Sequence, residues 1–216
     1  MNTDKQPDES LINFLNRLKP STTPVSSGPW IWIDNPHAKR PSECHVRNFK
    51  QEGYRLLENC ASQRRDLETQ YSDKHTGVIT KLPTVDVLKE DIVKLARVNN
   101  IMNGKWMLFS SPSHVDDVWA RVARATSAGE LGTGAKVATA RDDRKSRLIC
   151  VYTYDFSDKN DVKRVWRKLN ELKLVEQGIF YKCDAYTHLD IMNDNEYKLK
   201  ASMYGSKEML NDCYLP

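Results

Sequence analysis

Several kinds of signal are missing from this sequence of 216 residues, and each absence narrows the class of protein. No run of about 18 apolar residues occurs, so we expect no membrane-spanning helix. The first ten residues, MNTDKQPDES, are polar and acidic, and we expect no secretory leader. The five cysteines are odd in number, widely spaced and never arranged as C-x-x-C. This pattern indicates reduced thiols in an intracellular protein, without a disulfide framework or a zinc site.

Motifs for catalysis and for cofactor binding are also missing. The stretch GELGTGAK, 129–136, has the two glycines of a phosphate loop. However, Ala135 separates Gly134 from Lys136, and Val137 replaces the Ser or Thr that binds Mg²⁺. The sequence contains neither H-E-x-x-H nor G-x-S-x-G, and its five histidines are isolated. We therefore predict a non-enzymatic protein that needs neither a metal nor a cofactor.

The spacing of the apolar residues predicts an α+β protein. Strands are expected at 30–33, 76–81, 105–109, 135–140, 147–156, 179–189 and 197–205. Helices are expected within 11–18, 43–71, 84–98, 113–126 and 157–174, with a break at Gly53 as an open alternative. The elements predict a curved, mostly antiparallel sheet with helices packed on one face. Residues 1–27 are expected to form a short helix and a linker, and residues 28–216 a single domain.

Two of the five tryptophans lie two positions apart in the segment SGPWIWIDNPH, 27–37. Because side chains alternate along a strand, Trp30 and Trp32 are expected on one face, about 6.6 Å apart. They are candidates for stacking a base. The alternative is that they seal the sheet as ordinary packing residues, and the sequence leaves both interpretations open.

Basic residues outnumber acidic ones between Arg121 and Lys173, which favours a partner that carries phosphate. The charged turn at 141–146 lies between two expected strands. Five cations in or near it are the candidate phosphate contacts: Lys136, Arg141, Arg144, Lys145 and Arg147. The alternative is a solvated hairpin tip that Asp142 and Asp143 partly neutralise.

The order of several motifs resembles the cap-binding family of translation initiation factor 4E. These motifs are KWMLF, VDDVWARV, AKVAT and RLICVYT, at 105–109, 115–122, 135–139 and 147–153. A closer resemblance, carried by PWIW (29–32), GKW (104–106) and YKCDAYTHLDI (181–191), is to the Bles-type basophilic-leukaemia-expressed proteins. The resemblance implies a 4E-like fold over about residues 28–205, and it implies no activity.

The 4E resemblance implies two binding surfaces and contradicts a third. It places Trp119 on a helical face that holds a peptide partner, and this predicted set is Val115, Trp119, Arg164 and Arg167; the alternative for Trp119 is core packing. The resemblance also implies that the basic turn binds phosphate. The usual aromatic sandwich for methylated guanine is missing, because the stretches 110–114 and 127–134 contain no aromatic residue.

Taken together, these features predict an intracellular binding protein for RNA or a nucleotide, acting through the sheet face and the basic turn. The alternative is a protein-interaction module that uses the helical face around Trp119 without binding nucleic acid. No membrane partner is expected. We expect the protein in the cytoplasm, and the nucleus is left open as a second location.

Overall fold

The computed structural model describes five stretches of the chain: residues 3–39, 43–72, 85–141, 145–175 and 178–211. The chain divides into two compact units. The first unit comprises residues 1–40, 103–182 and 202–216, and the second comprises residues 41–102 and 183–201.

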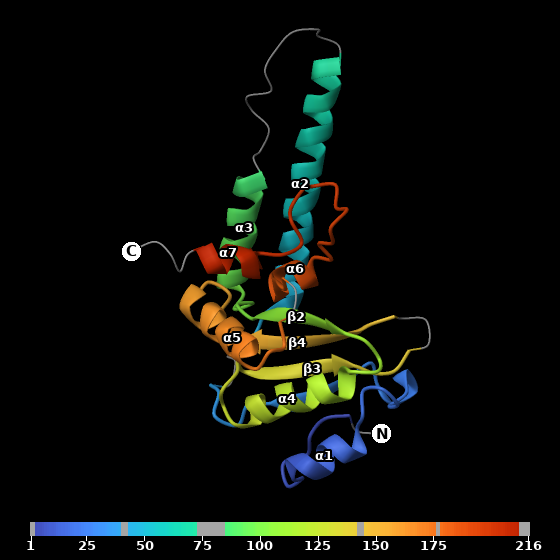
Figure 1. Ribbon diagram of the computed structural model, residues 1–216. Coiled ribbons are helices and arrows are strands. Elements are labelled where there is room, and N and C mark those ends of the chain that lie inside the picture. The colour runs from blue at the N-terminus through green and yellow to red at the C-terminus, as the bar shows by residue number, and fades with distance from the viewer. Residues whose placement is uncertain (1–2, 40–42, 73–84, 142–144, 176–177, 212–216) are drawn as a thin grey trace. The chain divides into compact units, whose positions relative to one another are not determined.

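A six-stranded sheet forms the centre of the first unit (Figure 1). Its spatial order is β1-β3-β4-β2-β5-β6. The strands are β1 (Trp30–Asp34), β2 (Gly104–Ser110), β3 (Gly134–Ala138), β4 (Arg147–Thr153), β5 (Phe180–Cys183) and β6 (Tyr204–Gly205). The pairs β1–β3, β3–β4, β2–β4 and β5–β6 are antiparallel, as the sequence predicts.

Helices pack on one face of this sheet. Helix α4 (Val115–Ser127) contacts β1, β3 and β4, and helix α5 (Lys159–Glu171) contacts β4. The side chains of Ile31, Val137 and Val151 are fully buried, and the Trp106 indole Nε1 donates to the Val162 carbonyl of α5 at 2.9 Å. The predicted class, an α+β protein with an antiparallel sheet and helices on one face, is confirmed.

The N-terminal helix α1 (Leu11–Arg17) lies against α4, as Figure 1 shows. Its only buried side chain, Phe14, meets Trp119 edge to face, with ring centroids 6.5 Å apart. The linker adds two hydrogen bonds, because the amide and hydroxyl of Ser21 both donate to the Asp116 carboxylate. Ser113 and Asp116 have the spacing of a capping box, but Asp116 instead anchors the linker, and α4 has no side-chain cap among the described residues.

An ion pair stabilises this N-terminal segment, and we expect it to weaken in acid. The Arg17 guanidinium donates to both Glu9 carboxylate oxygens, at 2.7 and 2.6 Å, and lowers the pKa of Glu9 below its usual value of about 4.5. The stabilisation is present above that usual value and is lost as the pH falls through the lowered pKa. Hydrogen exchange of the α1 amides should therefore accelerate in acid beyond the intrinsic rate change. Glu9→Gln should show the faster exchange already at neutral pH, and unchanged protection in that variant would contradict this role.

In its described residues, the second unit contains three helices: α2 (Val46–Ser72), α3 (Val85–Val98) and α6 (Asp184–His188). Helix α2 continues through Gly53, so the predicted alternative of a break there is wrong. The glycine allows close packing, because a Cβ atom at Gly53 would lie only 2.5 Å from the Leu189 side chain. Helices α2 and α3 pack side by side, as Figure 1 shows.

Two of the expected strands are much shorter than the sequence predicts. The strand expected at 179–189 ends at Cys183, where the Cys183 sulfur accepts from the Tyr186 amide and the chain turns into α6. The alternation at 197–205 gives only the two residues of β6, because Asn195 binds the Leu199 backbone and turns the chain. The strand expected at 76–81 lies outside the described residues. No helix in the described part of the chain is long and apolar enough to cross a membrane.

Candidate nucleic-acid interface

Strand β1 places its two tryptophans and its two isoleucines on opposite faces of the sheet. Ile31 and Ile33 are buried on the face that the helices cover, with exposures of 0% and 1%. Trp30 and Trp32 are half-buried on the other face. The period-2 alternation of a strand produces this division. The tryptophans are therefore neither core residues nor fully solvated.

The face that bears the tryptophans continues across four strands, because their antiparallel register aligns residues of β1, β3, β4 and β2. Residues directly opposite each other in paired strands point to the same side of the sheet. Trp32 lies opposite Lys136, Lys136 opposite Cys150, and Cys150 opposite Met107. The neighbouring row runs from Gly134 through Tyr152 to Lys105. We call this surface the aromatic sheet face and define it by Trp30, Trp32, Lys105, Phe109, Lys136, Leu148 and Tyr152.

The side chains of the aromatic sheet face contact one another. Trp32 and Tyr152 are stacked, with ring centroids 5.7 Å apart and an interplanar angle of 21°. The Lys136 ammonium lies 4.2 Å from the Trp30 centroid, 4.6 Å from that of Trp32 and 5.5 Å from that of Tyr152. The Lys105 ammonium lies 5.6 Å from the Tyr152 centroid. The face thus combines three aromatic rings with two cations, of which Lys105 is buried, with an exposure of 6%, and Lys136 is half-buried.

The outer edge of β1 is already paired. The Trp32 amide donates to the Thr3 carbonyl at 3.2 Å, and the Lys5 amide donates to the Trp32 carbonyl at 3.1 Å. An incoming strand therefore finds the middle of this edge occupied by residues 3–5. A ligand can reach β1 through its side chains more readily than through its backbone.

The predicted cations do not all join this face. Arg141 and Lys145 are exposed at the ends of β3 and β4, while Arg144 lies outside the described residues. Arg147 is 5% exposed and lies opposite Ser110, on the face of the sheet that carries the buried residues of β4. Of the five predicted cations, only Lys136 contacts the tryptophans among the contacts that the structure describes.

The predicted partner-binding residues do not form one exposed surface. Val115 and Trp119 both have an exposure of 0%, in agreement with the core alternative for Trp119. Arg167 is exposed on α5. Arg164 is also exposed, but its guanidinium is engaged by the protein itself, because it donates to the Glu130 and Leu131 carbonyls and pairs with Asp161 at 2.7 Å.

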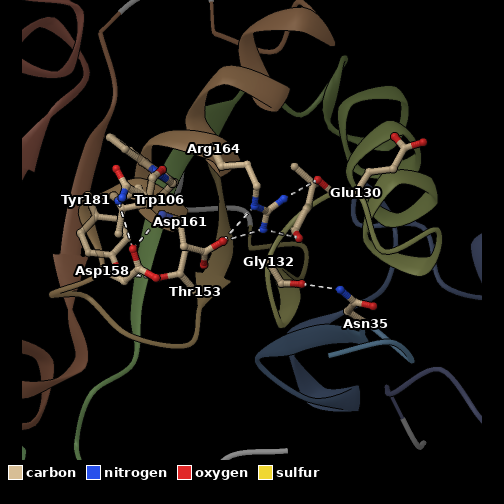
Figure 2. A network of polar contacts seen from close by, with 12 residues as sticks. Asn35, Trp106, Glu130, Gly132, Thr153, Asp158, Asp161, Arg164 and Tyr181 are labelled. Carbon is tan, nitrogen blue, oxygen red and sulfur yellow. Dashed lines mark hydrogen bonds and ion pairs between the residues drawn. The ribbon is translucent and has the colours of Figure 1, made fainter. Parts of the chain in front are cut away.

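Figure 2 shows this polar network, which fixes the stretch 128–133 between α4 and β3. From the other side, the Asn35 side-chain amide donates to the Gly132 carbonyl at 2.8 Å. The adjoining pocket of about 410 Å³ is lined by three aspartates. Asp155 binds Ser157, Asp158 caps α5, and Asp161 pairs with Arg164, so all three carboxylates have structural roles. Within the described residues, no group of three potential ligands could hold a metal ion.

Sequence reasoning missed Tyr152 and Lys105 as members of the face. Each lies in a correctly predicted strand, and alternation alone puts each on a definite side of that strand. The missing information is the pairing, since the register decides which side of β4 and β2 is continuous with the tryptophans. Alignment of Gly134 with Tyr152 would have found Tyr152, and alignment of Tyr152 with Lys105 would then have found Lys105.

The chain belongs to the family of the basophilic leukemia-expressed protein Bles03, whose model matches residues 1–190. This agrees with the closer of the two resemblances seen in the sequence motifs.

Solved structures of eIF4E proteins also match part of the chain. A schistosome eIF4E complexed with m7GpppA and 4E-BP is 13% identical, with a TM-score of 0.40, covering 49% of this chain and 60% of that one. The Caenorhabditis elegans eIF4E-3 in complex with the 4E-binding protein Mextli and a cap analogue is 18% identical, with a TM-score of 0.36 and coverages of 42% and 55%. The Ascaris suum eIF4E-3 with m2,2,7G cap is 20% identical, with a TM-score of 0.34 and coverages of 39% and 52%. The chain thus spans between about half and three fifths of these structures.

Proposed function

We propose that this protein binds single-stranded RNA or nucleotides through the aromatic sheet face, without catalysing a reaction. One observation carries the proposal: Trp30, Trp32 and Tyr152 lie half-buried on one face of the sheet, around the ammonium of Lys136.

Stacking supplies the sequence-independent part of the recognition. Every base has a flat π surface, and stacking on an aromatic side chain contributes about 1–3 kcal/mol per base. Trp32 and Tyr152 already stack on each other, so a base that stacks on the outer side of one ring would extend an existing stack. Phe109, with 66% exposure, extends the apolar surface on β2.

The cations of the face and of the basic turn supply the attraction for phosphate. Lys136 lies among the tryptophans, and Arg141 and Lys145 are exposed at the adjacent strand ends. Ammonium and guanidinium groups that neutralise phosphates release counterions, so the affinity should fall steeply with salt. Arg147 is no part of the proposal, because its side chain is buried on the other face.

Removal of both tryptophans tests the proposal. In a fluorescence polarisation assay with a labelled uridine-rich RNA, Trp30→Ala/Trp32→Ala should weaken binding at least about tenfold, because two stacking surfaces are lost. Ile12→Ala, which truncates a side chain of 71% exposure on α1, is the matched control and should bind as the wild type does. Thermal melting would verify that both variants are folded.

Two outcomes would contradict this function. The first is the absence of RNA or nucleotide binding by the wild-type protein at low salt. The second is binding of undiminished affinity in the double variant, which would mean that the ligand uses another surface.

A further inference from the structure

The position of the Lys136 side chain carries an inference that rests on the proposed function and names the chemistry of the ligand. Three aromatic rings surround its ammonium within 5.5 Å of their centroids. Such a group of rings is an attractive site for a cation, because the face of each ring carries negative quadrupolar charge. Here a side chain of the protein itself occupies that site.

We infer that Lys136 fills the cation position of the aromatic sheet face, so that the face accepts neutral bases with anionic phosphates and rejects positively charged rings. The same tryptophans without this lysine would favour cationic rings. Lys136 is therefore the residue that determines the charge specificity of the face.

The register explains why the ammonium stays in place. Lys136 and Trp32 are directly opposite each other in the β1–β3 pair, and Trp30 lies two positions before Trp32 on the same face. A lysine extending from the middle of β3 can thus reach both indoles without leaving the sheet surface. The strand backbone of both residues is held by the ladder, which keeps the lysine aligned with the rings.

The repulsion of a cationic ring follows from distance. A positively charged base stacked on these tryptophans would lie on the order of 5 Å from the ammonium, and two unit charges at that separation repel even in water. The resulting penalty is at least about fourfold in affinity and grows if the site excludes water. A phosphate on the same ligand is attracted by the same ammonium, so charge on the ring and charge on the phosphate act in opposite directions.

A matched pair of nucleotides measures the specificity. GTP and 7-methyl-GTP differ by one methyl group and, in mildly acidic buffer, by one positive charge on the ring. Quenching of tryptophan fluorescence reports binding at the face, because Trp106, Trp119 and Trp166 are buried. The wild type should bind GTP at least about fourfold more tightly than 7-methyl-GTP.

Variants of the lysine should move this ratio. Lys136→Met keeps the chain length and removes the charge, so the ratio should fall to about one or reverse in favour of 7-methyl-GTP. Lys136→Arg keeps the charge and should keep the preference for GTP. Lys159→Met makes the same change at an exposed position of α5, a helix on the other side of the sheet, and should behave as the wild type does.

A second measurement needs no nucleotide. Iodide should quench the tryptophans of the wild type, of Lys136→Arg and of Lys159→Met more strongly than caesium does, whereas in Lys136→Met this difference should shrink. Wild-type protein that binds 7-methyl-GTP as tightly as GTP, or more tightly, overturns the inference and leaves the proposed function intact. An unchanged iodide preference in Lys136→Met also overturns it. Absence of binding by both nucleotides, with the iodide difference lost only in Lys136→Met, contradicts the proposed function and supports the charge role of Lys136.

Discussion

Replacement of Gly132 with alanine should destabilise the first unit by about 3 kcal/mol or more, because the fold leaves no space for a methyl group there. A Cβ atom at this position would lie 1.7 Å from the Tyr152 backbone carbonyl oxygen. That oxygen accepts a hydrogen bond from the Thr133 amide at 2.9 Å, and the Gly132 carbonyl accepts one from Asn35. The stretch cannot move away without breaking both bonds. Urea unfolding, followed by far-UV circular dichroism, would measure the loss.

Gly178→Ala is the matched control for this prediction. A Cβ atom at Gly178 would meet its nearest neighbours, Lys207 and Ser206, at 3.5 Å, which is ordinary contact. The glycine is also exposed, so the free energy of unfolding of this variant should change by no more than about 0.5 kcal/mol. Equal stabilities of the two variants would show that 128–133 can relax at little cost.

Trp119→Ala should cost about 3–5 kcal/mol of stability, the usual range for truncation of a buried aromatic residue. Trp119 has an exposure of 0% and packs against Phe14 of the N-terminal helix. We therefore expect this variant to unfold at lower temperature and lower denaturant concentration. Phe14→Ala removes the other ring and should also destabilise the protein, with the effects of the two substitutions less than additive because the rings touch.

The Trp119 substitution also separates the two functions that the sequence leaves open. If Trp119 were an exposed partner-binding residue, its truncation would reduce partner binding and leave the melting temperature unchanged. Arg167→Ala, at an exposed position of α5, serves as the control and should leave stability nearly unchanged. A Trp119→Ala variant with wild-type stability would contradict the buried position of Trp119. The helical face around it would then again be a candidate surface for binding a protein partner.

The candidate site was only partly predictable. Alternation correctly placed Trp30 and Trp32 together on one face of a strand, because that property depends on local geometry. The predicted convergence of the basic turn failed for Arg147, whose side chain lies on the buried face of β4. One position in a strand changes the face, so adjacent cations in the sequence need not be neighbours in space.

In two places the local sequence pattern predicted a structure that the protein does not adopt. The stretch 179–189 has the apolar content of one strand, yet the Cys183 sulfur caps a helix that begins at Asp184. Ser113 before α4 and Asp116 in its first turn match a capping pattern, but the Asp116 carboxylate binds Ser21 from a distant part of the chain. Such alternatives differ by only a few hydrogen bonds, and tertiary contacts select between them.

The sequence by itself determined the α+β class, the existence of strands β1, β2 and β4, the membership in the Bles03 family and the pairing of two tryptophans on one face. These depend on periodicity and on motif order, which a linear chain carries directly. Only the tertiary structure decided that Trp119 is covered by Phe14, that Tyr152 joins the tryptophans and that the Lys136 ammonium lies among their rings. The physical reason is that strand register and helix docking bring together residues far apart in the chain, and side-chain packing over the whole sheet selects the register.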